Sequence, residues 1–515
     1  MAPSSSSSYD GSTEPAQTMP DDRSEGHQEG GTDPEKTVPP PPPAEKPDAH
    51  IVAWEEGDTD NPHTWSLKRK WFVTIILNVL PLVVNVGSSI LSGSGTALEA
   101  EFHVSSEVTI LVITLFLLGF TFGPLMFGPL SERIGRKIPI VLGVTLFATF
   151  CIPVALAQNY YTILICRFFS GLFGSAAMAV TGGAVTDVWP SPIMRGVGMD
   201  IFIMTGFLGP VLGPIIGSFV TESYLGWRWV MWITAIIAYS FIIFFFLTVP
   251  ETFAPVLLTR KAHRLRLQTK NWAIHSRLEE NDTDLKTFAK AYLLRPWILL
   301  ATEPIYLVMT IYMAFTYGLL FLFFEGFPIA FVEVRHWKPQ LASLSFLGLA
   351  IGVLIAVVFT IWYTLTIFTR QAMATPGVIV PERRLPPMMI GAVILPPGMF
   401  WAAWTSHAST PWPAQVAAYI LVGIALFIIF VQGFKYIVDV YLYVANSAIS
   451  GNTFARSFFG AAFPLFSPAL YHNLGVPWAT SLLAFIALAL APVPLIFYLY
   501  GAKIRSYSKN ALAPS

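Results

Sequence analysis

The feature that most constrains this chain is a series of apolar runs, each about 20 residues long, that starts at Phe72 and continues almost to the C-terminus. A helix of that length spans the hydrocarbon core of a bilayer and satisfies its own backbone hydrogen bonds there. The runs do not alternate apolar with polar residues, as the strands of a membrane β-barrel do. The sequence therefore predicts an all-α membrane protein with twelve transmembrane helices, at residues 72–92, 108–128, 138–157, 162–186, 198–220, 229–249, 302–324, 341–368, 385–405, 414–438, 446–470 and 477–500.

The composition excludes several classes of protein. Charged residues make up 12% of the 515 residues, whereas a soluble domain carries about 25%. Such a chain is not an ordinary soluble enzyme, a nucleic-acid-binding protein or a disordered protein. Both cysteines, Cys151 and Cys166, lie in apolar runs and indicate neither a disulfide framework nor a metal site. With no catalytic constellation and no P-loop, we expect no enzymatic activity, no cofactor and no use of ATP.

The positions of Lys and Arg predict the orientation in the membrane. Nine basic residues lie between residues 260 and 295, while the loops on the other side hold only Arg228, Arg335 and Lys338. Because cytoplasmic loops are enriched in Lys and Arg, both termini are expected in the cytoplasm. The plasma membrane is the expected location, and the vacuolar membrane is the alternative.

The long polar stretch after the sixth run divides the chain into two halves. We expect a disordered cytoplasmic tail (1–60), a six-helix bundle (61–250), a cytoplasmic linker (251–301), a second six-helix bundle (302–501) and a cytoplasmic tail (502–515). Two parallel six-helix halves around a central cavity are a common layout among transporters.

The strongest local motif is residues 128–137, GPLSERIGRK, between the second and third predicted helices. Its glycines permit a sharp turn, and Glu132 can pair with a basic group or cap a neighbouring helix. Together with Arg133 and Arg136 it could form a latch that holds one conformation and releases another. The alternative interpretation is a turn that carries the usual cytoplasmic positive charge.

Two charged residues fall inside predicted helices, where a charge is unfavourable and marks a functional candidate. Arg167 lies in the fourth helix and Asp200 near the start of the fifth. Each has an alternative interpretation. Arg167 could extend to the extracellular surface, and Asp200 could favour the positive end of the helix dipole.

The fifth helix also carries Gly206, Gly209, Gly213 and Gly217, interspersed with Pro210 and Pro214. Glycines at this spacing predict close packing against another helix, and the prolines permit bending.

The tenth helix contains Lys435 and Asp439, which share a helix face because they are four residues apart. They could pair with each other. Alternatively, Lys435 could offer its charge to an anionic substrate.

Residues 128–137 resemble the signature of the major facilitator superfamily, and Arg167 occupies the place of an arginine that this family uses in proton coupling. The glycine–proline stretch of the fifth helix is similar to the antiporter motif of its exporters. Residues 227–233, 250–252, 323–328 and 452–466 resemble the fungal twelve-spanner drug:proton antiporters. The chain departs from the pattern at Glu132, Ser218 and Lys435, where Asp, Gly and a neutral residue are usual.

The resemblance implies a proton-coupled exporter of drugs, toxins or secondary metabolites, with an organic acid as one candidate substrate. The alternatives are an importer of a nutrient or polyamine with the same fold, and a receptor or channel without alternating access. The expected partners are a small molecule, protons and the lipid bilayer, with no nucleic acid and a monomeric state. The residues expected to act in coupling and conformational change are Arg167, Glu132, Arg133, Arg136, Asp200, Gly213, Pro214 and Gly217; those expected in the substrate cavity are Lys435, Asp439, Asn85, Glu325 and Arg456.

Overall fold

The computed structural model describes residues 50–55, 57–280, 294–374, 380–508 and 510–511, and all its named elements are helices. The long helices of the first half are α1 (Leu67–Ser89), α3 (Ser106–Ile134), α4 (Lys137–Ala155), α5 (Tyr160–Val188), α6 (Pro192–Thr221) and α7 (Trp227–Thr248). Those of the second half are α12 (Pro304–Pro328), α14 (Phe346–Tyr363), α16 (Leu385–Trp404), α17 (Trp412–Val440), α18 (Ala445–Leu490) and α19 (Val493–Arg505). The predicted all-α membrane fold is confirmed.

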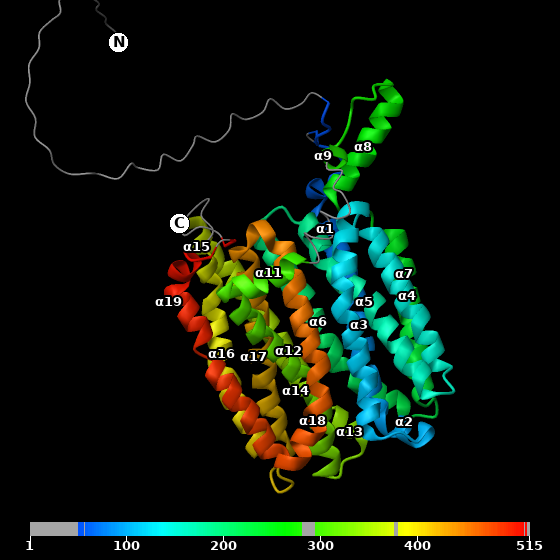
Figure 1. Cartoon of the computed structure of the whole chain (residues 1–515), viewed down its shortest axis with the longest axis vertical. Coiled ribbons are helices and arrows are strands. Elements are labelled where there is room, and N and C mark those ends of the chain that lie inside the picture. Colours follow the sequence, from blue (N-terminus) through cyan, green and yellow to red (C-terminus); the bar gives the residue numbers. More distant parts are fainter. Residues whose placement is uncertain (1–49, 56, 281–293, 375–379, 509, 512–515) are drawn as a thin grey trace, which may run out of the picture. The chain divides into compact units, whose positions relative to one another are not determined.

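Eleven continuous helical stretches in the described residues are long and apolar enough to cross a membrane. The last of them, Ser447–Arg505, is 59 residues long, and Gly475 inside it has a non-helical backbone with φ 73° and ψ 159°. The chain reverses direction there and returns along the bundle as the end of α18 and α19 (Figure 1). This stretch therefore supplies two of the twelve expected spans.

The two halves meet along two pairs of helices. α3 packs against α18, and α6 packs against α14. Figure 1 shows α3, α4, α5 and α7 on one side of the bundle and α16, α17 and α19 on the other. Any movement of one half relative to the other must therefore rearrange contacts made by α3 and α6.

The glycine face of α6 packs directly on α1, as its spacing predicts. A Cβ atom at Gly213 would overlap the Ser89 side chain, and one at Gly217 would overlap the Ile90 carbonyl oxygen. The Ser89 hydroxyl donates a hydrogen bond to the Pro210 carbonyl at 2.7 Å. These contacts hold α1 and α6 at backbone-to-backbone distance.

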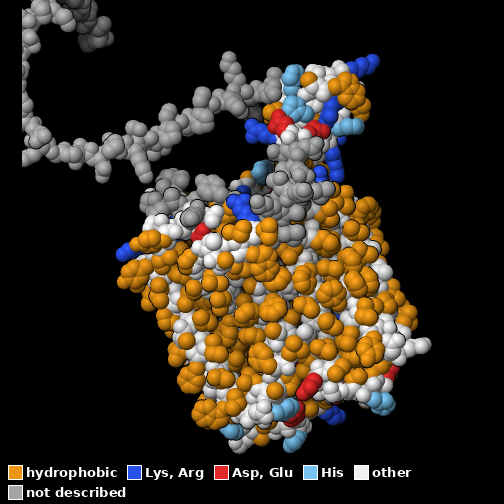
Figure 2. Space-filling view, viewed as in Figure 1, with side chains coloured by type: hydrophobic (Ala, Val, Ile, Leu, Met, Phe, Trp, Pro, Cys, Tyr) orange, Lys and Arg blue, Asp and Glu red, His pale blue; other side chains and the backbone are white. Residues whose placement is uncertain are grey.

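The sides and the ends of the bundle differ in chemistry. On the face shown in Figure 2, hydrophobic side chains cover the sides and charged side chains gather at the ends. Large apolar residues such as Ile243, Phe246 and Leu247 of α7 are more than half exposed. Side chains of this kind on the outside of a helix bundle are suited to contact with lipid, as a multi-pass membrane protein requires.

The linker between the halves contains helices that the sequence does not reveal. They are α8 (Ala254–Thr269), α9 (Arg277–Glu280) and α11 (Arg295–Thr302), while residues 281–293 lie outside the described part. The segment before α1 pairs with this linker. Lys261 Nζ lies 3.1 Å from Glu55 Oε1 and 2.9 Å from Asp58 Oδ2, and the Val52 N–H donates to the His275 carbonyl at 3.0 Å. Structured contacts thus begin before the expected tail boundary at residue 60; residues 1–49 lie outside the described part.

Candidate functional site

A buried ion pair connects the two halves of the protein. Asp200 Oδ1 on α6 lies 2.6 Å from Lys435 Nζ on α17. The side chain of Asp200 has no exposed surface and that of Lys435 is 6% exposed. Asp200 is near the start of α6 and Lys435 near the end of α17, so the pair lies toward the predicted cytoplasmic end of the bundle. An ion pair in this place stabilises contact between the halves only while both groups are charged.

The partners of Lys435 and Asp439 differ from the expected pairing. Asp439 binds Arg384, whose Nε lies 2.9 Å from Asp439 Oδ2, and Lys435 binds Asp200 instead. Thr360 of α14 also lies beside Asp200. The charge of Lys435 is thus balanced by a carboxylate in this structure; its contact with an anionic substrate stays a prediction.

Arg167 of α5 binds backbone carbonyl groups from two other helices. Its guanidinium donates to the carbonyl oxygens of Gly87 at 2.8 Å, Ser88 at 2.6 Å and Val112 at 3.2 Å. It also lies 4.4 Å from the ring centre of Phe116. Arg167 has no exposed surface, so it does not extend to the extracellular side. The residue instead links α5 to α1 and α3 through charged hydrogen bonds.

Arg456 of α18 is buried in contact with aromatic rings. Its guanidinium carbon lies 4.9 Å from the ring centre of Tyr317 and 5.4 Å from that of Phe430. Phe207 of α6, from the first half, packs edge-on against both rings at 6.0 and 5.0 Å. We call Phe207, Tyr317 and Phe430 the aromatic cage. The cage joins residues from both halves next to a single buried cation.

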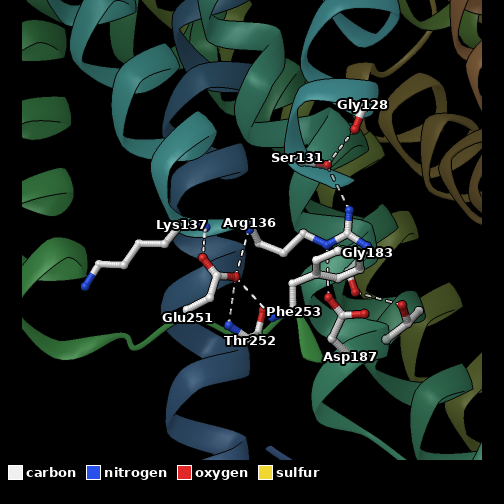
Figure 3. A network of polar contacts seen from close by, with 10 residues as sticks. Gly128, Ser131, Arg136, Lys137, Gly183, Asp187, Glu251, Thr252 and Phe253 are labelled. Carbon is white, nitrogen blue, oxygen red and sulfur yellow. Dashed lines mark hydrogen bonds and ion pairs between the residues drawn. The ribbon is translucent and has the colours of Figure 1, made fainter. Parts of the chain in front are cut away.

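The signature at residues 128–137 forms a compact polar network at the predicted cytoplasmic end (Figure 3). Arg136 Nε binds Asp187 Oδ2 of α5 at 2.9 Å, and Arg136 Nη1 donates to Ser131 Oγ at 2.8 Å. The guanidinium also faces the Phe253 ring at 4.4 Å. Gly135, with φ 97°, makes the turn that brings Arg136 into this position.

The Glu251 carboxylate ties the signature to the end of the first half. Oε1 accepts the backbone N–H groups of Arg136 at 2.8 Å and of Thr252 and Phe253 at 3.0 Å, and Oε2 accepts that of Lys137 at 3.1 Å. The start of α4 and the start of the linker therefore share one anionic acceptor. A negative charge is favourable near the N-terminus of a helix such as α4.

Residues 381–387 of the second half, PERRLPP, are a degenerate counterpart of the signature, yet they take part in a corresponding set of ion pairs. Arg384 binds Asp439 near the end of α17, as Arg136 binds Asp187 near the end of α5. Arg505 Nε at the end of α19 lies 3.0 Å from Glu382 Oε1. Asp439 thus belongs to this network at the end of α17.

The remaining predicted residues have varied surroundings. Glu132 is half-buried and Arg133 exposed near the end of α3. The Asn85 side chain donates to the Pro81 carbonyl at 2.8 Å and approaches Met178 of α5. Glu325 is half-buried in α12, and none of the ion pairs found among the described residues includes it. The structure brings together Asp200 and Lys435 but joins neither Asn85 nor Glu325 to them by a bond.

Sequence reasoning assigned no site role to five residues with clear structural roles: Asp187, Glu251, Phe207, Tyr317 and Phe430. The two carboxylates lie near the ends of α5 and α7, close in the sequence to basic residues. That position could have identified them as partners for the basic residues of the signature. The three aromatic residues gave no signal, because each lies in a helix with many other large apolar residues.

The sequence and the fold are similar to those of known membrane transporters. The sequence profile of the Major Facilitator Superfamily matches residues 79–464. A citrinin biosynthesis cluster MFS transporter of Monascus ruber is 48% identical over 476 residues, covering 91% of this chain and 94% of that protein. An ascochitine biosynthesis cluster MFS transporter of Didymella fabae is 46% identical, covering 90% of this chain and 89% of that protein. The structure of the proton:xylose symporter XylE has a TM-score of 0.60 at 15% identity, covering 85% of this chain and 96% of that one.

Proposed function

This chain belongs to the major facilitator superfamily and is a transporter rather than an enzyme, and from that premise we propose that it is a proton-coupled antiporter that exports a small organic molecule. The observation that carries the proposal is the buried Asp200–Lys435 pair between α6 and α17. A carboxylate at that place can accept a proton, and its charge holds the two halves together. One site can therefore connect proton binding to the separation of the halves.

The physical steps follow from the charges. A proton on Asp200 gives a neutral acid and leaves the Lys435 ammonium buried without a counter-ion. A buried charge without a partner is destabilising by roughly 3–5 kcal/mol, so this state favours access of water to the pair. Opening at the predicted cytoplasmic end then lets the proton leave, and re-formation of the pair closes that end. Protons would enter from outside and leave to the cytoplasm while substrate moves outward.

Other polar and charged groups near Asp200 and Lys435 affect how readily Asp200 takes up a proton. Arg384 and Asp439 lie on the second-half side, and Thr360 faces Asp200 from α14. Arg384 is itself neutralised by Asp439, so Lys435 is the cation that directly balances Asp200. In this proposal Arg167 and the signature residues Glu132, Arg133 and Arg136 act on the same movement by holding the helices of the first half in fixed positions.

The direction and the substrate class rest on the relatives. Two similar transporters are named for biosynthesis clusters, one for citrinin and one for ascochitine. A transporter that belongs to a biosynthesis cluster supports movement of a secondary metabolite, and we propose that this chain exports one across the plasma membrane. The glycine–proline face of α6 supports the same direction through its resemblance to the exporter motif. An importer would use the same interface, and it would accumulate substrate inside intact cells.

The test uses purified protein in proteoliposomes with citrinin as the probe. A pH gradient should drive citrinin against its concentration gradient, with counter-movement of protons reported by a trapped pH-sensitive dye. Asp200→Asn should abolish the dependence on the pH gradient. Glu333→Gln is the matched control, because Glu333 is exposed and pairs with His472 away from α6 and α17. If the unmodified protein moves citrinin at the same rate with and without the pH gradient, the proposed proton coupling is refuted.

A further inference from the structure

Arg456 differs from every other buried basic residue in the described part of the chain. Lys70, Arg167, Arg384, Lys435 and Arg505 each bind a carbonyl oxygen or a carboxylate. Arg456 is 4% exposed, and the structure gives its guanidinium no hydrogen bond and no ion pair. Contacts with two ring faces compensate only part of the loss of hydration. A planar cation with five N–H donors is therefore left without an acceptor.

The surroundings of Arg456 are suited to a flat apolar group. Tyr317 comes from α12 and Phe430 from α17, and their rings lie 6.1 Å apart. Phe207 approaches both from α6, and Phe427 adds a further edge contact with Phe207 at 5.8 Å. Aromatic rings of this kind bind planar conjugated groups by stacking or edge contact. A ligand there would touch elements of both halves.

The cage is also linked to the Asp200–Lys435 pair through α6. Phe207 follows Asp200 by seven residues, which places both on one face of α6 about two helical turns apart. Lys435 and Phe430 lie on the same helix, α17, of the second half. A ligand that orders Phe207 and Phe430 would thus act on the two helices that form the ion pair.

From these observations we propose that Arg456 and the aromatic cage bind the carboxylate and ring system of an aromatic or conjugated organic acid. A guanidinium donates a pair of parallel charged hydrogen bonds to a carboxylate, and the rings beside it can contact the flat group that carries the carboxylate. The proposal rests on the proposed function, because it names the substrate class of the same transporter. It also replaces Lys435 with Arg456 as the cation that meets the substrate.

Equilibrium binding tests the site without any proton gradient. The probes are anthracene-9-carboxylate, its uncharged amide and cyclohexanecarboxylate, added to the full-length protein in nanodiscs. We expect the aromatic acid to bind at least tenfold more tightly than either of the other two compounds. Arg456→Gln should remove the preference for acid over amide. Equal binding of acid and amide by the unmodified protein would overturn the proposal.

A second pair of variants keeps the experiment informative if loss of Arg456 impairs folding. Phe207→Leu retains Arg456. It should weaken binding of the aromatic acid at least fivefold and leave binding of the aliphatic acid unchanged. Arg335→Gln is the control, because Arg335 binds the carbonyls of Thr405 and Thr410 outside the cage. An equal effect of Phe207→Leu on both acids would overturn the role of the cage. Acid preference without gradient-driven transport would refute the proton coupling and leave this site intact.

Discussion

Asp200 and Lys435 are 235 residues apart in the sequence, yet their side chains form one buried ion pair between the two halves. Each residue sits in a mostly apolar helix, so each is destabilising without the other. The pair therefore gives a direct experimental handle on how the halves are held together.

We expect Asp200→Asn and Lys435→Met each to lower thermal stability, by roughly 3–5 kcal/mol for a buried pair. The double variant should recover most of that stability, because it buries no charge, but it should not recover dependence on a pH gradient. The measurement is thermal unfolding in detergent combined with gradient-driven transport in proteoliposomes. Additive losses in the double variant would show that the two groups do not interact.

Arg167→Ala should impair both folding and transport. The substitution leaves the carbonyls of Gly87, Ser88 and Val112 without their donor, and a charged hydrogen bond contributes about 1.5–3 kcal/mol. We expect a loss of at least about 3 kcal/mol in the free energy of unfolding, by the same estimate. Arg167→Lys retains a charge but not the planar guanidinium. Its free energy of unfolding should lie between those of Arg167→Ala and the unmodified protein. A fully stable Arg167→Ala protein that fails only in proton coupling would contradict this structural role.

Glu251→Ala should reduce turnover more than Glu251→Gln. The amide oxygen of glutamine can still accept the three hydrogen bonds that Oε1 accepts, but its NH2 group faces the N–H of Lys137 and cannot accept the fourth. Alanine loses all four hydrogen bonds. Comparing turnover per molecule at the membrane separates this effect from poor expression. Glu333→Gln is again the control, because Glu333 is exposed and lies outside the signature. Identical turnover in both Glu251 variants would exclude the carboxylate as the link.

Glu132→Gln tests the latch at the same end of the protein. The substitution keeps the shape of the side chain and removes its charge. If Glu132 makes a contact that forms in only one conformation, turnover should fall more than the amount of protein at the cell surface. A proportional fall in both quantities would indicate a role in folding instead.

The segment before α1 should detach from α8 in acid. Asp58 accepts a hydrogen bond from Lys261, and this contact holds the pKa of the Asp58 carboxyl below its usual range. A carboxyl with a lowered pKa stabilises the docked segment above its ordinary pKa of about 3.9 and ceases to do so as the pH falls through the lowered value. Hydrogen exchange of the Val52 amide should therefore accelerate below about pH 4, relative to amides within α3.

Lys261→Met should make that exchange fast at neutral pH as well. Arg264→Met is the matched control, because Arg264 lies 3.8 Å from Asp60 in an exposed pair that contributes little. Unchanged protection of Val52 in the Lys261 variant would show that the backbone contact with His275 is sufficient.

The sequence predicts the helices well because each span must be apolar over its whole length. The break between residues 470 and 477 even coincides with the reversal at Gly475, where the backbone leaves the helical region. The signature likewise predicts a tight polar turn, because Gly135 and its basic neighbours act locally.

The ion pairs were less predictable, because they depend on contacts between distant helices. The four-residue spacing of Lys435 and Asp439 indicated a local pair, but Asp200 and Arg384 approach more favourably from other elements. The setting of Arg456 shows the same limit. An arginine in an apolar helix signals importance, whereas the absence of an acceptor is visible only when Tyr317 and Phe430 are in place.

The overlap that any side chain larger than glycine would create at Gly213 and Gly217 has a mechanical consequence. Because there is no room between them, α1 and α6 must move together along this stretch. Asp200 lies in the first third of α6 and Phe207 near its middle, whereas Ile90 directly follows the last residue of α1. A tilt of α6 that follows a change at Asp200 would therefore move α1 as well, as far as Ile90.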